Sequence, residues 1–476
     1  MTTLDDLLLW RLLLSPDRRV FLRPRTNVAN TKVDPITYRD LELHVSRLAA
    51  KWASITAPPV TRKTFEGGDL NNQDNANDHT SDSGSKLIAP RSLVGLCLPS
   101  QYVFAVAVFA LIRLGAVPVC LSPTNSDEVL EHLAKEAGVS AVISVNDTHG
   151  QLGDRLRRIP NGAMIINVES RDVSDLCISE YSPYPRLKYG SISGDDIAIV
   201  LHTSGSTSIP TLVPLSHRLL LRLPAGSTSR TDGFKVSKQP VVTTAGTPLF
   251  HILGVLNGII LPIYGGSIFA IPPQTLEDAQ AGRTRPSART LVDYAKTVGA
   301  KRLTVTPTML MEIALLGSKS GVNLESGSEG MNFLRALNRV TVSATPMCQD
   351  HGDWIAEQGV HLVQVYGLTE GGCLLHSDRP RGDPNWQGMR PFPNVKYKMQ
   401  PFGYIPGTSV PLYELVVKSA KKGGHFPGAF QETDEYHTRD LFQEWPIPGT
   451  GKYRFYGRKD EIILLLPGHS CLPSSE

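Results

Sequence analysis

The sequence predicts an α/β fold, with a large N-terminal core of αβ subdomains built on parallel sheets and a β-rich subdomain after it. Between Arg91 and Tyr366, short apolar runs alternate with helical segments, a pattern typical of parallel sheets that helices cover on both faces. After about Asp383 the pattern changes to strand-like alternation with turns, as at 394–399 and 412–417. The length of 476 residues allows two to four such units.

The first 55 residues predict a helix-rich entry segment. Leucines recur there at helical spacing, at Leu4, Leu7, Leu8 and Leu12. Thr37 or Asp40 is expected to begin a second helix, since both residue types stabilise helix N-termini. From about 58 to 88 the composition changes to Asn, Asp, Gly, Ser and Thr, which bury too little apolar surface to fold, so we expect a disordered insertion.

Regular alternation of strands and helices is predicted next. The expected strands are the apolar runs 93–98, 116–121 and 139–145. Between the first two, an apolar helix is expected from Tyr102 to Leu114, where Gly115 ends it. Asn125 with Glu128 forms a capping-box-like start for another helix. This part of the chain should therefore form one parallel sheet with its covering helices.

The alternation continues through the second half of the core. Further strands are expected at 241–245, 267–271, 302–306, 339–343 and 361–366, with helices at 288–298 and 309–316. The weakly charged stretch from Ile252 to Ile271 contains four glycines and Pro262, so a buried helix followed by a strand is expected rather than a membrane span.

Composition excludes several function classes. A net charge of +3 with no basic stripe gives no reason to expect a nucleic-acid partner. The six cysteines lack the CxxC spacing of zinc sites, and their scatter indicates a reducing, cytoplasmic setting. Acidic residues precede the short apolar run near the N-terminus, the reverse of a secretory signal.

A loop rich in hydroxyl groups follows a predicted buried strand. The strand is the apolar run 197–201, and Thr203, Ser204, Gly205, Ser206 and Thr207 come directly after it. Backbone N–H and hydroxyl groups in such a loop can surround phosphate oxygens, and ligands on parallel sheets bind beyond the carboxyl ends of the strands. A plain surface loop would have the same composition, so the loop alone does not decide between these interpretations.

Five short motifs follow one another along the chain. They are Thr203-Ser204-Gly205-Ser206-Thr207, Pro248-Leu249-Phe250-His251, Tyr366-Gly367-Leu368-Thr369-Glu370, Tyr436-His437-Thr438-Arg439-Asp440-Leu441 and Gly457-Arg458-Lys459-Asp460. This order closely resembles the motif series of the adenylate-forming (AMP-binding) enzymes, which include acyl-CoA and aryl-CoA ligases, peptide-synthetase adenylation domains and the adenylation parts of fungal synthetase-like carboxylic acid reductases. Matches at 37–41 and 113–119 extend the resemblance over nearly the whole chain.

The resemblance implies a reaction in which a carboxylate attacks the α-phosphate of ATP, giving an acyl-adenylate and pyrophosphate. A thiol, from CoA or a phosphopantetheine carrier, is the expected acyl acceptor. The implied roles are Mg²⁺ binding for Glu370, phosphate binding for Thr369 and the 203–207 loop, adenine stacking for Tyr366 beside Gly367, and ribose binding for Asp440 with Arg458 close by. Taken singly, Tyr366 could fill the core, Glu370 could begin a helix and Asp440 could lie in a turn.

His251 bears on the substrate. Peptide-synthetase domains that activate α-amino acids usually have an aspartate at the corresponding position, where it pairs with the ammonium group, so the histidine indicates an acid without an α-amino group. An aryl or acyl acid of secondary metabolism is therefore expected. The alternative interpretation of His251 is a core histidine that bonds a backbone carbonyl.

Two motifs depart from the family pattern. Where the family usually has Thr-Gly-x-Pro-Lys, this chain has Thr207-Ser208-Ile209-Pro210-Thr211, so Ser208 replaces a glycine and Thr211 a lysine. Arg439 replaces the glycine of the Asp440 motif, where it would either crowd the ribose site or supply a substitute charge. These departures support a second hypothesis, a degenerate non-catalytic homologue that at most binds nucleotide.

The resemblance also suggests domain limits. We expect the adenylation core at 1–382, the β-rich subdomain at 383–457, and a hinge with a truncated C-terminus at 458–476. The family's small C-terminal domain carries a lysine that contacts the substrate carboxylate, and no lysine follows Lys459. A carrier protein or a separate C-terminal or reductase module is therefore an expected partner, besides the small carboxylic acid.

Overall fold

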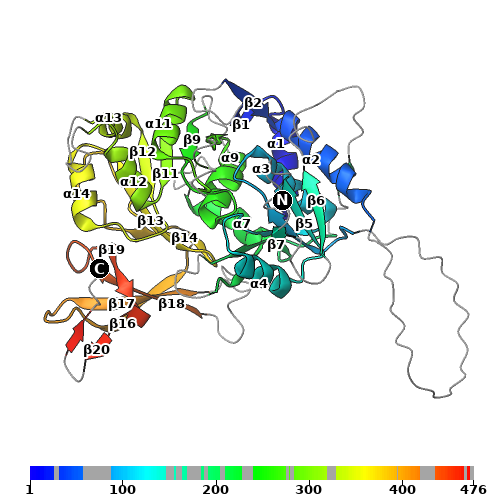
Figure 1. Cartoon of the computed structure of the whole chain (residues 1–476). Helices are drawn as coiled ribbons and strands as arrows, with labels where there is room; N and C mark the ends of the chain where they lie inside the picture. The colour runs from blue at the N-terminus through cyan, green and yellow to red at the C-terminus, as the bar shows by residue number, and fades with distance from the viewer. Residues whose placement is uncertain are drawn as a thin grey trace, which may run out of the picture.

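The computed structural model describes residues 1–25, 32–56, 87–145, 155–156, 163–168, 184–186, 191–203, 209–227, 240–274, 278, 283–318, 328–393, 395–418, 435–461, 463–465 and 469–471. The insertion expected at 58–88 lies outside these residues except for its last two positions. Ile88, at its end, is buried in the core that also contains Val94 and Leu96. Two large αβ units and a smaller all-β unit make up the molecule (Figure 1).

The entry segment forms two capped helices and a two-stranded edge. Helix α1 (Leu4–Leu14) is followed by β1 (Arg19–Pro24), β2 (Val33–Thr37) and helix α2 (Tyr38–Ala53). Thr37 is the N-cap of α2 and accepts a hydrogen bond from the backbone N–H of Asp40, whose carboxylate in turn accepts from the Thr37 backbone N–H. Both residues predicted to begin this helix therefore take part in its capping box.

The first sheet has six strands in the order β6-β5-β3-β4-β7-β8. Its strands are β3 (Leu93–Cys97), β4 (Val117–Cys120), β5 (Ala141–Val145), β6 (Met164–Val168), β7 (Ile197–His202) and β8 (Leu212–Ser216). All neighbours run parallel except the edge pair β7 and β8. The parallel sheet predicted from the alternation is confirmed, while its antiparallel edge strand was not foreseen.

Helices α3 (Tyr102–Leu114), α4 (Asp127–Ala137) and α7 (His217–Ser227) accompany this sheet. Helix α3 has the predicted limits, and Gly115 ends it with φ of 77°, a left-handed conformation that favours glycine. The predicted start of α4 was wrong by one position. The N-cap is Ser126, whose hydroxyl accepts from the Val129 backbone N–H, because serine caps a helix as well as asparagine does.

The second sheet has nine strands in the order β15-β14-β13-β12-β11-β9-β10-β1-β2. Its further strands are β9 (Val242–Ala245), β10 (Ile268–Ala270), β11 (Arg302–Val305), β12 (Arg339–Val342), β13 (Leu362–Leu368), β14 (Gly372–His376) and β15 (Arg390–Pro391). The strands from β13 to β1 run parallel, and antiparallel strands flank them at both edges. Its helices are α11 (Ala288–Thr297), α12 (Pro307–Ala314), α13 (Glu329–Ala336) and α14 (Gln349–Glu357).

The glycine-rich stretch before β10 is helical, as predicted, but irregular. Short α-helical turns α8 (Ile252–Gly254) and α9 (Leu261–Gly265) flank a π-helical segment, η2 (Val255–Ile260). A Cβ on Gly254 would lie 1.8 Å from the Pro248 carbonyl oxygen, so only glycine allows this approach. In the described residues, none of the helices combines the length and apolar character needed to cross a membrane.

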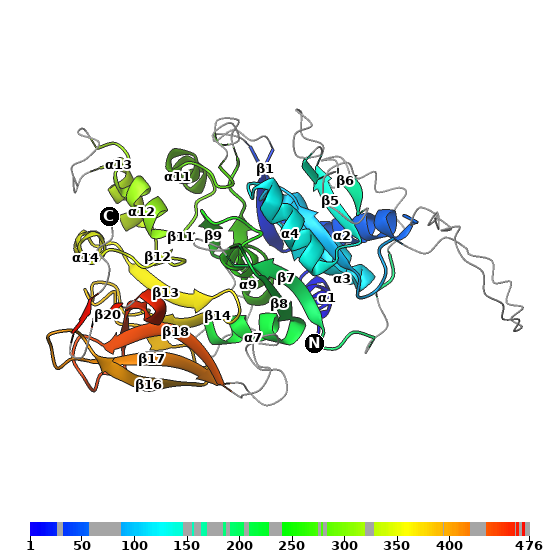
Figure 2. The same cartoon turned by 60° about the horizontal axis from the view of Figure 1, so that its bottom comes forward.

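A four-stranded antiparallel sheet forms the β-rich unit. Its strands are β16 (Tyr397–Tyr404), β17 (Pro411–Lys418), β18 (Glu435–Glu444) and β19 (Tyr453–Arg458), followed by the 3-10 turn η3 (Lys459–Glu461) and the hairpin of β20 (Ile463–Leu465) and β21 (His469–Cys471). Both views show it beside β13 and β14 (Figures 1 and 2). Val365 and Leu375 of those strands share a core with Leu415 and Phe442. The predicted fold class, a parallel-sheet αβ core plus a β-rich unit, is thus confirmed.

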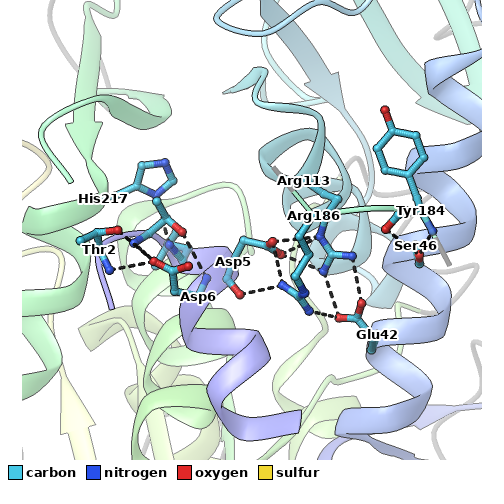
Figure 3. Close-up of polar contacts among 11 residues, drawn as sticks. Thr2, Asp5, Asp6, Glu42, Ser46, Arg113, Tyr184, Arg186 and His217 are labelled. Atoms are coloured by element: carbon cyan, nitrogen blue, oxygen red, sulfur yellow. Dashed lines mark hydrogen bonds and ion pairs between the residues drawn. The ribbon is translucent and has the colours of Figure 1, made fainter. Parts of the chain in front are cut away.

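A buried ion-pair network joins α1, α2 and α3 (Figure 3). Arg113 has no exposed side-chain surface and donates to both carboxylate oxygens of Asp5, at 2.8 and 3.0 Å, and of Glu42, at 2.9 and 3.0 Å. Arg186 bonds the same two carboxylates. Two arginines and two acids thus balance one another in the interior, which fixes the entry segment against the first sheet.

Two buried histidines should make stability fall in acid. His44 contacts the Tyr102 hydroxyl at 2.8 Å, and His217 Nδ1 accepts from the Leu4 backbone N–H. Burial lowers the pKa of each imidazole from 6.5 to about 4. The unfolded chain binds a proton at each histidine more strongly than the folded chain does. The contribution of each neutral histidine to the free energy of unfolding is therefore complete above pH 6.5 and is lost as the pH falls towards 4. We expect on the order of 1–2 kcal/mol less unfolding free energy per histidine at pH 5.

Urea unfolding between pH 7 and 5 measures this loss. The His44→Gln variant should take up about one proton fewer on unfolding than the wild-type protein, since each buried neutral histidine gains one. The exposed His132→Gln is the matched control and should leave the pH dependence unchanged. If the free energy of unfolding changed with pH in the same way for all three proteins, this would contradict the conclusion that His44 is neutral in the folded state.

Candidate functional site

A cavity of about 480 Å³, here called the main cavity, lies where β7, β12 and β13 end and β18 and β19 approach them. It is lined by eight of the residues predicted from sequence: Thr203, His251, Tyr366, Gly367, Thr369, Glu370, Asp440 and Arg458. The four remaining predicted residues, Ser204, Gly205, Ser206 and Thr207, lie outside the described residues, as does Ser208. Segments separated by more than 200 positions therefore meet at one cavity.

The turn between β13 and β14 carries Thr369 and Glu370 into the main cavity. Gly367 precedes it at an irregular strand pair, where a Cβ would lie 2.2 Å from the Gly372 carbonyl oxygen, so a larger residue cannot fit. Within the described residues, Glu370 makes no hydrogen bond or ion pair. Its interpretation as a helix-start acid was wrong, because the chain continues as a strand at Gly372.

Tyr366 and Asp440 are joined directly. The Tyr366 hydroxyl donates to Asp440 Oδ2 at 2.5 Å, and burial next to that carboxylate holds the pKa of the phenol well above its usual value. The tyrosine ring stacks on Phe455, with centroids 6.3 Å apart and planes at 24°. Asp440 is 4% exposed, and its other oxygen, Oδ1, lies 3.8 Å from Arg458 Nη1. One carboxylate oxygen is thus held by the tyrosine and the second faces the arginine.

Arg439, which replaces the family glycine, keeps a left-handed backbone with φ of 60°. Such a conformation costs a non-glycine residue about 1–2 kcal/mol. Its side chain is 64% exposed, lies 3.5 Å from the Asp460 carboxylate and does not line the main cavity. The expected crowding of the ribose site is therefore not seen, and the charge of Arg439 is directed to Asp460.

His251 caps α8 and reaches the main cavity. Its Nδ1 accepts from the Leu253 backbone N–H at 3.3 Å, which leaves the proton of the neutral ring on Nε2. Burial lowers the pKa of this imidazole to about 4, and nearby His202 adds to the effect. At neutral pH His251 is therefore an uncharged hydrogen-bond donor. This contact differs from the carbonyl bond of the alternative interpretation.

Hydrogen bonds join Thr203 and Thr211, the residues on either side of the hydroxyl-rich loop. The Thr203 backbone N–H donates to the Thr211 carbonyl at 3.0 Å, and the Thr211 backbone N–H donates to Thr203 Oγ1 at 3.1 Å. The two hydroxyls lie 3.3 Å apart. Thr211 is exposed and does not line the main cavity. The position where the family has lysine therefore closes the loop and brings no cation to the site.

Sequence reasoning missed the segment that follows β12. Ser343, Ala344, Thr345 and Pro346 line the main cavity, and Gln364 of β13 lies beside them. Ala344 has φ of 85°, a strained conformation of the kind found at functional sites. The segment has neither a glycine nor a charged residue to mark it. The signal available was Thr345-Pro346 directly after a predicted strand, at the sheet edge where ligands bind.

The comparison with known families places the chain among the adenylate-forming enzymes, a family that activates carboxylic acids. It belongs to the family of AMP-binding enzymes, whose model matches residues 85–401. It is 25% identical over 396 residues to the adenylate-forming reductase stbB of Stachybotrys bisbyi, covering 81% of this chain and 33% of that protein. The AMP-binding domain-containing enzyme iboA of Amanita muscaria is also 25% identical over 396 residues, covering 79% of this chain and 69% of that protein.

Solved structures agree on the fold. The anthranilate CoA ligase AuaEII in complex with anthranoyl-AMP matches with a TM-score of 0.69 at 14% identity, covering 99% of this chain and 80% of that chain. Identity this low shows the fold alone. The chain spans about a third of the length of the fungal reductases it matches. Substrate and acyl acceptor therefore have to be argued from the site.

Proposed function

We propose that this chain uses ATP and Mg²⁺ to convert an aryl or acyl carboxylic acid into an acyl-adenylate and pyrophosphate. The observation that carries the proposal is the convergence of the eight predicted residues on the main cavity. A thiol of CoA or of a phosphopantetheine carrier then takes the acyl group. We further propose that the chain acts in secondary metabolism in the cytoplasm, and that a carrier or reductase module is its partner.

The reaction brings two negatively charged groups together, the substrate carboxylate and the triphosphate of ATP. The substrate carboxylate attacks the α-phosphorus, a new C–O–P link forms, and the bond to pyrophosphate breaks. Mg²⁺ neutralises phosphate charge when bound, and it usually takes one or two carboxylates together with the phosphates. Glu370 fits this need, because its carboxylate lines the main cavity and has no hydrogen-bond partner among the described residues. Thr203 and Thr369 donate their hydroxyls to phosphate oxygens.

The remaining residues bind the nucleoside and the acid. Tyr366 presents its ring to adenine, and its hydroxyl fixes Asp440 so that Oδ1 can accept from a ribose hydroxyl. Arg458 lies close to the same oxygen and adds positive charge. The Nε2–H of His251 donates to the substrate carboxylate without repelling or attracting it by charge. A neutral donor suits an acid that has no α-ammonium group.

Exchange of labelled pyrophosphate into ATP tests this proposal. The full chain, with Mg²⁺ and a panel of aryl and acyl acids, should show exchange that depends on the acid. Amino acids should support less exchange than acids of the same size without the ammonium group. If none of the acids in the panel supported exchange, this would contradict adenylation by this chain alone.

A second candidate function is nucleotide binding without turnover. It is favoured by Thr211, which bonds Thr203 at the position where the family pattern implies a lysine. Calorimetry with ATP and Mg²⁺ separates the two candidates. Tight ATP binding without exchange supports the second, whereas binding accompanied by exchange supports the first.

Thr211→Lys should raise the exchange rate if the loop has lost a phosphate contact. One charge-assisted hydrogen bond to phosphate is worth about 1.5–3 kcal/mol, so we expect an increase of about tenfold or more. Thr211→Met is the matched control, since it adds length without charge. Equal rates for both variants would show that a cation at this position does not help.

A further inference from the structure

A second cavity of about 230 Å³ adjoins the main cavity. The two share four lining residues: Leu253, Ser343, Val365 and Cys373. The second cavity lies between the face of the nine-stranded sheet and the helical segment 252–265, to which Leu253, Asn257 and Leu261 belong. The two cavities therefore lie next to each other along these four residues.

The second cavity carries surplus positive charge. Arg302 of β11 and Arg339 of β12 are paired in register on neighbouring parallel strands, and both line it. Like charges at such positions repel each other. Asp378 is the one acid among its described lining residues, and His376 adds no charge at neutral pH because burial lowers its pKa to about 4. Two cations thus face one carboxylate.

Arg339 is held so that part of its guanidinium remains available. Its Nε donates to Thr341 Oγ1 at 3.2 Å, and its Nη1 lies 3.3 Å from Asp378 Oδ2. The third nitrogen, Nη2, bonds no described residue, and the side chain is 24% exposed. Because the guanidinium lies beside Thr341, it is about two strand residues, or about 7 Å, from Ser343 and the main cavity. That span corresponds to a single ring with groups at opposite ends.

We propose that the acid activated by this chain carries a second anionic group, which Arg339 and Arg302 bind in the second cavity. The inference rests on the proposed function, because the carboxyl group to be activated then lies in the main cavity. Long apolar acids fit poorly. The second cavity is smaller than the roughly 300–1,000 Å³ typical of drug-sized ligands, and an apolar chain would remove water from charged arginines without replacing their hydrogen bonds.

Calorimetric titration of the full chain tests the inference with two acids of matched shape, benzene-1,4-dicarboxylate and 4-methylbenzoate. We expect the wild-type protein to bind the diacid about tenfold more tightly, which is the usual effect of one charge-assisted hydrogen bond. Arg339→Gln should abolish this preference, and Arg339→Lys should retain part of it. Asp378→Asn should strengthen diacid binding, because it removes the competing carboxylate.

Lys301→Gln is the matched control, since it removes an exposed positive charge from the adjacent position that does not line the cavity. It should leave both affinities unchanged. If Arg339→Gln fails to fold, Arg302→Gln serves in its place, because Arg302 is exposed at the strand start. Equal affinity for the two acids, no measurable diacid binding, or a preference that survives both substitutions overturns the inference.

Pyrophosphate exchange measured with the same acids separates this inference from the proposed function. Exchange supported equally by both acids, with no effect of Arg339→Gln, leaves adenylation standing and overturns the second anionic group. Arginine-dependent diacid binding without any exchange supports the second anionic group and contradicts adenylation by this chain.

Discussion

Replacing Glu370 with glutamine is expected to slow acid-dependent pyrophosphate exchange by about 10²–10³-fold. The amide keeps the size of the side chain but removes the negative charge that would bind Mg²⁺ beside the phosphates. Phosphoryl transfer depends almost entirely on positioning and on charge stabilisation, so the loss should appear in the rate itself. Exchange rates measured over a range of Mg²⁺ concentrations give the size of the effect.

The dependence on Mg²⁺ distinguishes a metal ligand from a residue of other function. The Glu370→Gln variant should need more Mg²⁺ to reach half of its maximal rate, while its thermal unfolding should stay close to that of the wild-type protein, since Glu370 makes no described hydrogen bond. Glu357→Gln, on the exposed face of α14, is the control and should change neither property. A variant with lower activity but an unchanged Mg²⁺ requirement would contradict the metal role.

Local sequence patterns predicted much of the fold because the cause of each element is local. Helix α3 has the predicted limits, since an apolar run and the conformational freedom of Gly115 are enough to define it. Most of the parallel strands followed from alternation alone, but β1 and β6 were not predicted. The antiparallel strands β2, β8 and β14 were not predicted, although each pairs with the strand just before it in the chain, because their short sequences lack a clear apolar alternation. The neighbours of the parallel strands were not predictable either, because that pairing depends on distant partners. Strand β1, for example, pairs with β10 across nearly the whole N-terminal half of the chain.

In the candidate site too, some features could be predicted from the sequence and others could not. Motif order identified eight residues that line the main cavity, since the resemblance carries spatial information that periodicity lacks. The bond between Tyr366 and Asp440 joins positions 74 residues apart, and no local pattern indicates it. The second cavity was missed as well. Arg302 and Arg339 look like ordinary strand-start residues until strand register places them side by side.

Replacing Arg113 with methionine is expected to lower the free energy of unfolding by about 3–5 kcal/mol. Methionine fills a similar volume but supplies no charge, so Asp5 and Glu42, which are 14% and 13% exposed, would have to share Arg186. An uncompensated buried carboxylate costs far more than the lost attraction of an exposed pair. Urea unfolding at pH 7 measures the difference, and α1 should detach first because Asp5 fixes it to α3.

The exposed pair of Arg218 and Asp195 provides the matched comparison. It also has two short contacts, at 2.6 and 2.7 Å, but its side chains are 38% and 49% exposed. Water screens such a pair, so Arg218→Met should cost less than about 1 kcal/mol. Adding Glu42→Gln to Arg113→Met should restore part of the lost stability, because it removes the carboxylate left without its partner. If Arg113→Met and Arg218→Met lowered the free energy of unfolding by similar amounts, burial would not strengthen the ion-pair network. The entry segment would then be held in place by its apolar contacts.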